Sequence, residues 1–269
     1  MKFDRRYILP FLLIAVLLLV ALFPGFFAPY ETTDRDATYQ PPSSDHILGT
    51  DNMGKDIFSL LIYGARWTLM IGFASGILAI LVGTSFGLLA GWRKGILDEF
   101  LMGTTDIVLI LPKIPLVIIL AAYLGPSPWV LILVLGLLSW ESIARVVRSK
   151  VMQIRSSNYI LAARCLGFSD AKIMVREILP VVFPVIVPKF VLVTAAAMIS
   201  EASLAFLGLS DPMMVSWGGM ISDAFTYSGF LRGMWYWWLP PALCIILGVL
   251  AITSLAFIHE RGIREVVQL

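Results

Sequence analysis

Long apolar stretches recur along the chain and are separated by shorter polar segments. No Asp, Glu, Lys or Arg occurs in residues 7–30, 67–92 or 233–258. Each of these stretches is long enough to cross a bilayer as a helix, which takes about 20 residues. Three more apolar stretches are shorter or carry isolated charges, namely residues 100–123, 127–140 and 181–206. The pattern predicts six transmembrane helices in an all-α, polytopic membrane protein.

Composition supports this class and excludes several others. Apolar residues make up 59% of the chain and charged residues 14%, whereas soluble domains have about 45–50% and about 25%. A net charge of +2 gives no basis for nucleic-acid binding. Cys165 and Cys244 lie far apart, without metal-ligand spacing or the density of a disulfide scaffold, so we interpret them as small buried side chains or free thiols.

The distribution of basic residues predicts the orientation of the helices. Of the 20 Lys and Arg, 14 fall in segments on the side of the N-terminus and 4 on the opposite side. Cytoplasmic loops carry the excess of basic residues, so both termini are expected in the cytoplasm. A cleaved signal peptide is the alternative for the first apolar stretch. That stretch exceeds the usual apolar region of about 7–15 residues, and no small-x-small cleavage site follows it.

The segment of residues 31–66 is expected to face outward. Residues 31–44 contain Pro41 and Pro42 and predict irregular extended chain, for which a solvated connector is the alternative function. Residues 50–64 place Ile57, Leu60 and Gly64 at helical spacing and predict a short amphipathic helix along the outer interface. We therefore divide the chain into residues 1–66, the first helix and outer loop, and residues 67–269, the remaining membrane domain.

A 40-residue segment, residues 141–180, is expected on the cytoplasmic side. Its apolar positions predict a short helix on each side of Gly167, which can adopt the left-handed conformation that ends a helix. Ser169 is a good N-cap for the second helix, and Pro180 either stops that helix or begins the next span. Seven positive charges accompany this turn. We interpret the segment as a compact basic knob that docks in a groove of a partner.

Three groups of residues resemble one known family. The first is similar to the cytoplasmic EAA loop of ABC importer permeases and comprises Ala162, Ala163, Gly167, Ser169, Asp170, Leu179 and Pro180. The second resembles the outer-loop signature of the peptide and nickel importer permeases and comprises residues 46–51, 54–56 and 63–66. The third resembles the fifth span of that family and the loop after it, and comprises residues 201–209 and 216–220.

The resemblance implies a type I ABC importer transmembrane domain in a prokaryotic inner membrane. It implies a second permease subunit, two cytoplasmic ATP-binding subunits and an extracytoplasmic binding protein as partners, with the Gly167 turn as the coupling helix. Its cargo would be short peptides or, second, nickel or a metal chelate. ATP and magnesium would bind the partner subunits, since this chain contains no phosphate-binding Gly-x-x-x-x-Gly-Lys-Ser/Thr motif; it is not expected to be an enzyme. One departure is Leu161, which stands where the family signature begins with glutamate.

The second span carries a regular stripe of glycines. Separations of 4, 7, 4 and 4 positions place on one helical face Gly72, Gly76, Gly83, Gly87 and Gly91. Small residues let helices approach closely in lipid, so the stripe predicts a packing seam within this subunit or against the second permease. Glycines without a packing role are the alternative.

Four charged residues inside predicted spans are candidates for the translocation path, namely Asp106, Lys113, Lys189 and Glu201. Matched depth allows an ion pair between Asp106 and Lys189, and two separately hydrated groups are the alternative. Lys113 lies between Pro112 and Pro115, where a broken helix could border the path and attract a carboxylate; a snorkelling or internally paired lysine is equally compatible. Glu201 fits either a gate or a polar packing group.

Other functional classes remain open at this stage. A self-powered secondary transporter would be expected to show internal repeats and intramembrane ion relays, of which the sequence gives little sign. A non-transporting membrane scaffold would use the cytoplasmic segment only for docking. No metal site is predicted, because His259 and Glu260 lack a second histidine four residues after the first.

Overall fold

The computed structural model describes the backbone of residues 8–267 and the side chains of residues 8–256. Within that part of the chain the regular structure is helical, and one isolated bridge joins Thr50 and Asp56. The helices are α1 (Ile8–Leu22), α2 (Pro24–Phe27), α3 (Ile57–Arg93), α4 (Ile96–Ile110), α5 (Lys113–Leu124), α6 (Pro128–Leu137), α7 (Glu141–Ile154), α8 (Asn158–Cys165), α9 (Asp170–Ile173), α10 (Leu179–Phe206), α11 (Trp217–Thr226) and α12 (Trp235–Val267). A π-helical turn, Met174–Ile178, joins α9 to α10.

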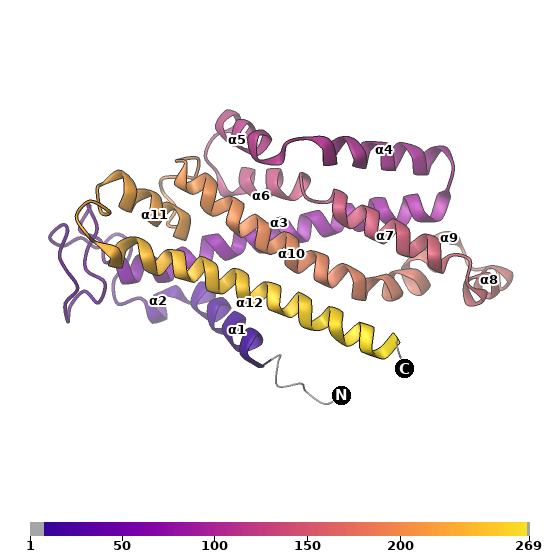
Figure 1. Ribbon diagram of the computed structural model, residues 1–269, viewed down its shortest axis with the longest axis horizontal. Coiled ribbons are helices and arrows are strands. Elements are labelled where there is room, and N and C mark those ends of the chain that lie inside the picture. Colours follow the sequence, from indigo (N-terminus) through magenta and orange to yellow (C-terminus); the bar gives the residue numbers. More distant parts are fainter. Residues whose placement is uncertain (1–7, 268–269) are drawn as a thin grey trace.

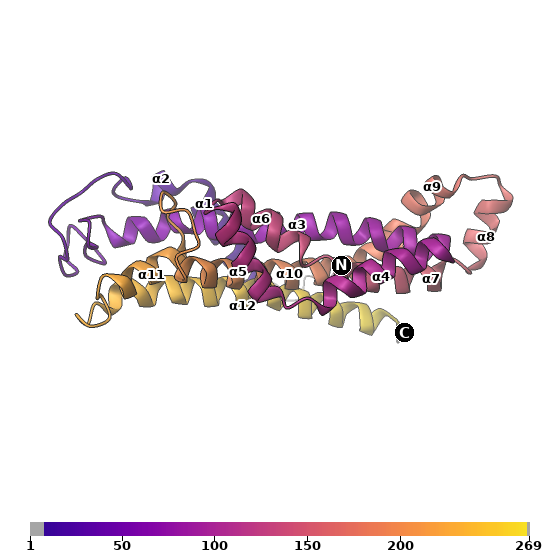
Figure 2. The same cartoon turned by 90° about the horizontal axis from the view of Figure 1, so that it is seen from above.

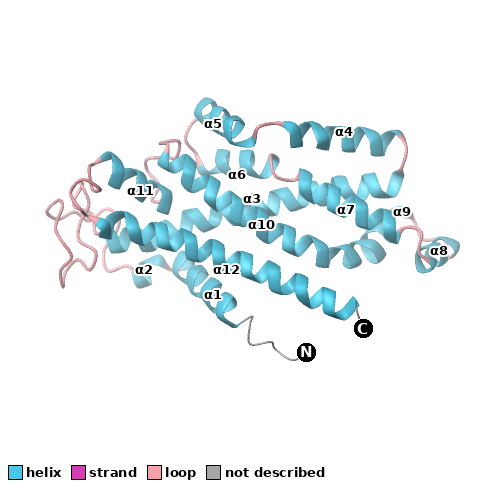
Figure 3. Ribbon diagram, viewed as in Figure 1, coloured by secondary structure: helices cyan, strands magenta, loops and turns pink. Residues whose placement is uncertain are grey.

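The longer helices, α3, α10 and α12, run side by side along the long axis of the molecule (Figures 1 and 3). Three are long and apolar enough to cross a membrane: Ile57–Arg93, Asp170–Phe206 and Trp235–Ala256. Two further crossings are made if the bent pairs α4–α5 and α6–α7 each count as one span, and α1 adds a shorter apolar helix of 15 residues. All six predicted apolar stretches are therefore helical, and the all-α membrane class is confirmed.

The two ends of the molecule differ. The outer loop (residues 31–56) lies at one end in Figure 1, beside the start of α12. The helices α8 and α9 project at the opposite end, where Figure 2 shows them extending beyond the other helices. The chain thus places its two longest loop regions at opposite ends of the bundle, as the sequence predicts.

Helix α3 is the centre of the bundle, and its glycines form the seam predicted from their spacing. A Cβ atom on Gly72 or Gly76 would lie 2.4 Å from side-chain atoms of α10. A Cβ atom on Gly83, Gly87 or Gly91 would lie 2.6–2.7 Å from atoms of Trp140 or of α7. All of these distances are shorter than those that real Cβ atoms make with other atoms, so a larger residue would not fit at these positions without a shift of its neighbours. The partner helices belong to this same chain, which selects the first of the two packing alternatives.

Two predicted short helices are parts of longer ones. The interfacial helix expected over residues 50–64 begins at Ile57, where Asp56 caps it by accepting the Ser59 amide hydrogen at 2.7 Å, and it continues without a break to Arg93. Gly64 lies inside this helix, where a Cβ atom would lie 3.0 Å from the Trp217 side chain. The residue 66/67 division therefore lies inside α3. Likewise, the helix that begins at Asp170 continues through the π-helical turn into α10, so Pro180 begins the span rather than ending a separate helix.

Only part of the segment of residues 141–180, which is expected in the cytoplasm, projects from the bundle (Figures 1 and 2). Its first part is α7, which packs along α3 and buries Ile143, Ala144, Val147 and Val151. These apolar residues lie on one face of α7, and Arg145 and Arg148 lie on another. Because of these charges the predicted apolar stretch ends at residue 140, whereas α7 continues along α3 to Ile154. The part that projects from the bundle begins near Arg155.

The seam gives a direct test of packing. We expect Gly87→Ala to lower the free energy of unfolding by about 1–3 kcal/mol, the usual cost of overpacking a tight core, because the new methyl would lie 2.6 Å from the Ala144 oxygen and from the Val147 Cβ. Gly103→Ala in α4 is the matched control, since nothing lies within 4 Å of its Cβ position. Thermal unfolding in detergent should separate the two variants. Equal stability would show that the seam is not tight.

Candidate functional site

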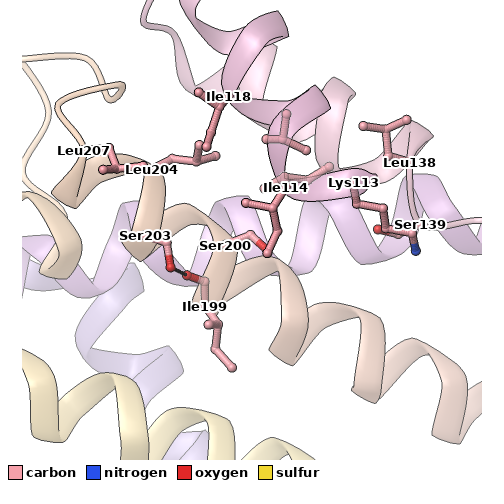
Figure 4. A pocket seen from close by; sticks show the side chains of 12 residues that line it. Lys113, Ile114, Ile118, Leu138, Ser139, Ile199, Ser200, Ser203, Leu204 and Leu207 are labelled. Atoms are coloured by element: carbon pink, nitrogen blue, oxygen red, sulfur yellow. Dashed lines mark hydrogen bonds between the residues drawn. The ribbon is translucent and has the colours of Figure 1, made fainter. Parts of the chain in front are cut away.

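A cavity of about 150 Å³ opens between α5, the end of α6 and α10. Its lining is mainly apolar, with Lys113 and the hydroxyls of Ser139, Ser200 and Ser203 as polar groups (Figure 4). Of the four charged residues proposed for the path, Lys113 alone lines this cavity. One of the residues predicted for the translocation path, Lys113, therefore lies at a cavity that a small ligand could enter.

A helix break positions Lys113 at this cavity. Helix α4 ends at Ile110, residues 111 and 112 are extended, and α5 begins at Lys113 with an 85° change of direction. Pro112 and Pro115 are compatible with the start of a helix, where a backbone N–H is not needed. The predicted break is therefore present, and it brings the lysine side chain to the bend.

Lys113 forms an ion pair with a residue that the sequence analysis did not single out. Its Nζ donates to Oε1 of Glu141 at 2.6 Å. Glu141 lies at the start of α7 with 3% of its side chain exposed, whereas 42% of the Lys113 side chain is exposed. The Oε2 atom of Glu141 is buried without a hydrogen-bond partner among the described residues. Of the two alternatives for Lys113 that the sequence left open, internal pairing is present, and the lysine also borders the cavity.

Two more ion pairs connect the same helices. Arg145 donates to Asp106 at 2.6 Å, and Arg148 donates to both carboxylate oxygens of Asp98, at 2.6 and 2.7 Å. Together with Lys113–Glu141 they form an ion-pair ladder that joins α4 and α5 to α7. The predicted pairing of Asp106 with Lys189 is wrong, because the Asp106 carboxylate forms its ion pair with Arg145 on the neighbouring helix.

A sequence signal for the ladder exists. Glu141, Arg145 and Arg148 follow one another at spacings of 4 and 3 and so share one face of a helix. Residues of opposite charge precede them in the order Asp98, Asp106 and Lys113. When the two segments pack antiparallel, this order is reversed, so that Lys113 lies beside Glu141, Asp106 beside Arg145 and Asp98 beside Arg148. This complementarity was missed because the segment from residue 141 was assigned to a cytoplasmic loop.

The other two candidates for the path lie elsewhere. Glu201 in α10 is 1% exposed, and neither carboxylate oxygen has a hydrogen-bond partner among the described residues. It lies outside the lining of the cavity. Lys189 is half-buried on α10 and has no carboxylate within 4 Å in the part of the chain described. The structure therefore does not gather the four charges at one site.

The turn around Gly167 has the predicted conformation. Gly167 has a φ of +77°, its N–H donates to the Arg164 oxygen, and the Phe168 N–H donates to the Ala163 oxygen. This pair of bonds is a Schellman motif, which satisfies the last carbonyls of α8. Ser169 occupies the N-cap position of α9, but its side chain makes no capping bond. Helices α8 and α9 with this turn form the knob (residues 155–173).

The knob is fixed to the end of α3. The Arg155 guanidinium donates to the Trp92 oxygen at 2.8 Å, and the Arg164 guanidinium lies 4.4 Å from the centre of the Trp92 ring. Arg93 and Asp170 approach to 3.9 Å. Ile160 and Ala163 are buried in the same apolar cluster as Trp92. A movement of the knob would therefore act directly on α3.

The surface of the knob is less basic than expected. Arg145 and Arg148 belong to the ion-pair ladder, and Arg155 and Arg164 turn toward α3. Three large apolar side chains of α8 and its following turn are exposed, by 45% for Tyr159, 47% for Leu161 and 75% for Leu166. Leu161, at the position of the family glutamate, is one of these exposed apolar residues.

The outer-loop motif folds the loop on itself. His46 is buried, and its ring nitrogens lie 3.0 Å from Asp56 and 3.4 Å from Asp36. Asp51 accepts the Met53 and Lys55 amide hydrogens, at 2.7 and 2.9 Å. Burial lowers the pKa of His46, but its hydrogen bonds to Asp56 and Asp36 outweigh this effect and leave the pKa above its ordinary value. The motif residues thus connect the loop to the N-cap of α3.

Comparison with known proteins identifies the family. Residues 83–265 match the family of binding-protein-dependent transport system inner membrane components. The oligopeptide transport system permease protein OppC of Bacillus subtilis is 35% identical over 94% of this chain and 82% of its own length. The chain belongs to the permeases of peptide ABC importers.

Other relatives agree with this assignment. The dipeptide transport system permease protein DppC of Bacillus subtilis is 33% identical over 89% of the permease and 75% of its own length. The glutathione transport system permease protein GsiD of Pectobacterium atrosepticum is 34% identical over 83% and 77%. A chain of the MetNI methionine ABC transporter, solved in inward facing conformations, superposes with a TM-score of 0.59 at 20% identity and covers 77% of the permease and 96% of itself. This likeness supports the fold alone.

Two ion pairs in the ladder of the permease differ in how deeply they are buried. The Asp98 and Arg148 side chains are 12% and 32% exposed and bond bidentately, whereas those of Asp106 and Arg145 are 55% and 47% exposed. We expect a double-mutant cycle of Asp98→Asn and Arg148→Gln to give a coupling energy of about 1.5–3 kcal/mol, as for buried charged hydrogen bonds. The cycle of Asp106→Asn and Arg145→Gln should give about 0.2–1 kcal/mol. Thermal unfolding measures both cycles, and the reverse ranking would contradict the structure.

The outer loop of the permease should be sensitive to pH. Because the folded-state pKa of His46 is raised, its contribution to stability is complete below the ordinary value of 6.5 and is lost as the pH rises through the raised pKa. Asp36, Asp56 and Tyr30 are the titratable groups that face the ring. We expect hydrogen exchange of residues 31–56, corrected for intrinsic rates, to accelerate between pH 6 and pH 8.

The control is His46→Gln, which removes the titrating group and keeps a polar side chain. Exchange in this variant should depend little on pH over the same range. A variant with the pH dependence of the wild type would assign that dependence to another group.

Proposed function

We propose that this permease forms, with a second permease subunit, the membrane path of an ATP-driven importer of short peptides. Peptides are favoured over nickel because the similar relatives are named for oligopeptides, dipeptides and glutathione. Two ATP-binding subunits would dock on the knob in the cytoplasm, and an extracytoplasmic binding protein would deliver the cargo at the outer loop. The membrane would be a prokaryotic inner membrane with both termini of the permease in the cytoplasm.

The observation that carries this proposal is the knob. A turn that only connected two spans would not need an exposed apolar face, since exposed apolar surface of this kind is typical of interaction sites. Tyr159, Leu161 and Leu166 give α8 and its following turn an exposed apolar surface. Arg155 at the end of α7 and Arg164 on α8 hold the knob against α3. A partner that binds this face would move α3, and α3 contacts α7 and α10 along its glycine seam.

Coupling would then follow from rigid movement rather than from chemistry within the permease. Closure of the ATP-binding subunits would displace the knob, and the spans would rock to open the path outward. Hydrolysis and release of the products would restore the inward-facing state. ATP would thus bias a two-state element at a distance, which is the physical content of allosteric coupling.

The proposal predicts the effect of a charge on the apolar face. Leu166→Glu should reduce copurification of the ATP-binding subunits and ATP-dependent peptide uptake by at least about tenfold, because it places a carboxylate at the centre of a desolvated contact. Ile47→Glu is the matched control, since Ile47 is a 56% exposed apolar residue on the outer loop. It should leave the ATP-binding subunits attached.

Both measurements use the assembly purified from its native membranes and reconstituted in vesicles. A wild-type permease that copurifies with no ATP-binding subunit would instead indicate a self-powered transporter. Association with such subunits but no uptake of any peptide would indicate a different cargo or a scaffold.

A further inference from the structure

We propose that the cavity beside α5 is a subsite for the C-terminal residue of a peptide in transit, in which Lys113 binds the free carboxylate and the apolar wall accepts the side chain. This inference rests on the function proposed above. It concerns a different property, namely which chemical group of the cargo the permease itself recognises.

Lys113 has hydrogen-bond donors left for a ligand. An ammonium group has three N–H donors, and the structure commits one of them, to Oε1 of Glu141. The lysine side chain remains 42% exposed and lines the cavity, whereas Glu141 is buried behind it. Glu141 is thus a positioning residue that holds the ammonium at the edge of the cavity. The remaining donors can meet an anion that enters from the open side.

The surroundings favour a carboxylate at this point. Lys113 is the one charged residue among the described residues that line the cavity. Charges in a mainly apolar lining are screened less than in water, so the Lys113 ammonium attracts a carboxylate that comes within its reach. The Glu141 carboxylate, which is held behind the ammonium, offsets part of this attraction. Arg145 and Arg148, the other cations of the ion-pair ladder, do not line the cavity. Lys113 is therefore the cation of the ladder that a ligand in the cavity would meet.

The opposite wall supplies hydrogen-bond acceptors. The hydroxyls of Ser200 and Ser203 donate to the Ala196 and Ile199 oxygens at 2.9 and 2.8 Å, and the second of these bonds is drawn in Figure 4. Because their hydrogens are engaged, these oxygens can accept a hydrogen bond but not donate one to an anion. A peptide offers the matching groups, since an amide N–H lies beside its terminal carboxylate.

The size of the cavity limits what it holds. A volume of about 150 Å³ fits one terminal residue rather than a whole peptide. Most of the lining is apolar and includes Ile114 and Ile118 of α5 and Leu204 of α10. An apolar C-terminal side chain would gain from burial here, and the rest of the peptide would extend out of the cavity into the path.

The test compares a free-acid peptide with its C-terminal amide in the complete assembly, in vesicles supplied with saturating loaded binding protein. Uptake of each peptide by a variant is divided by wild-type uptake of the same peptide. Lys113→Met should lower the ratio for the free acid at least tenfold more than the ratio for the amide. Lys113→Arg should largely restore the free acid. Arg145→Met is the matched control, because it removes a cation of the ladder that lies outside the cavity, and it should change both peptides by the same factor.

The outcomes separate this subsite from a structural role. If Lys113→Met lowers the uptake ratio of both peptides by the same factor, as Arg145→Met is expected to do, the lysine serves the ion-pair ladder alone and the proposal is overturned. If the wild-type assembly imports no peptide at all, the proposed function fails instead.

A second measurement does not depend on delivery of the amide. A dipeptide with a photoreactive phenylalanine at its C-terminus is irradiated with the assembly, and the labelled residues are mapped by mass spectrometry. Labelling should fall on Ile114, Ile118 or Leu204 and should decrease at least tenfold in Lys113→Met but not in Arg145→Met. Labelling confined to other segments would overturn the subsite.

Discussion

The close approach of α3 to α7 and α10 is the constraint on which the rest of the permease depends. Within a bilayer, an apolar side chain is surrounded by apolar groups whether or not its helix has a partner, so helix association has no hydrophobic driving force. Helices therefore associate through tight packing and polar contacts. The glycines of α3 supply that packing along most of the helix, first against α10 and then against α7. Every functional element described above is attached to one of these three helices.

The helices outside this seam are held in a different way. The bent pair α4–α5 has an 85° break and borders the cavity, and its contacts with α7 include the ion-pair ladder. Ion pairs and a broken helix can rearrange in discrete steps, whereas a glycine seam cannot open without losing many contacts at once. The permease thus combines a centre held by close glycine packing with a wall held partly by ion pairs, and the cavity lies along that wall.

The knob lies at the end of this centre, opposite the outer loop (Figures 1 and 2). Its cations serve mainly internal contacts: Arg155 satisfies the end of α3 and Arg164 lies over Trp92. Tyr159, Leu161 and Leu166 remain exposed. A partner that docked there would bury apolar surface, while the cations hold the knob against α3.

The sequence by itself determined much of this protein. Charge-free stretches fixed the membrane class and the helical segments, the glycine spacing fixed the seam, and Gly167 fixed the turn of the knob, because each is a local or periodic property of the chain. Tertiary structure decided what depends on partners far apart in sequence. Asp106 pairs with Arg145 rather than Lys189, Lys113 pairs with Glu141, and Glu201 is buried away from the cavity. Helical spacing places Glu141, Arg145 and Arg148 on one face, but only the fold decides which helix packs against that face, because an ion pair forms with the carboxylate or ammonium that the packed helices bring nearest.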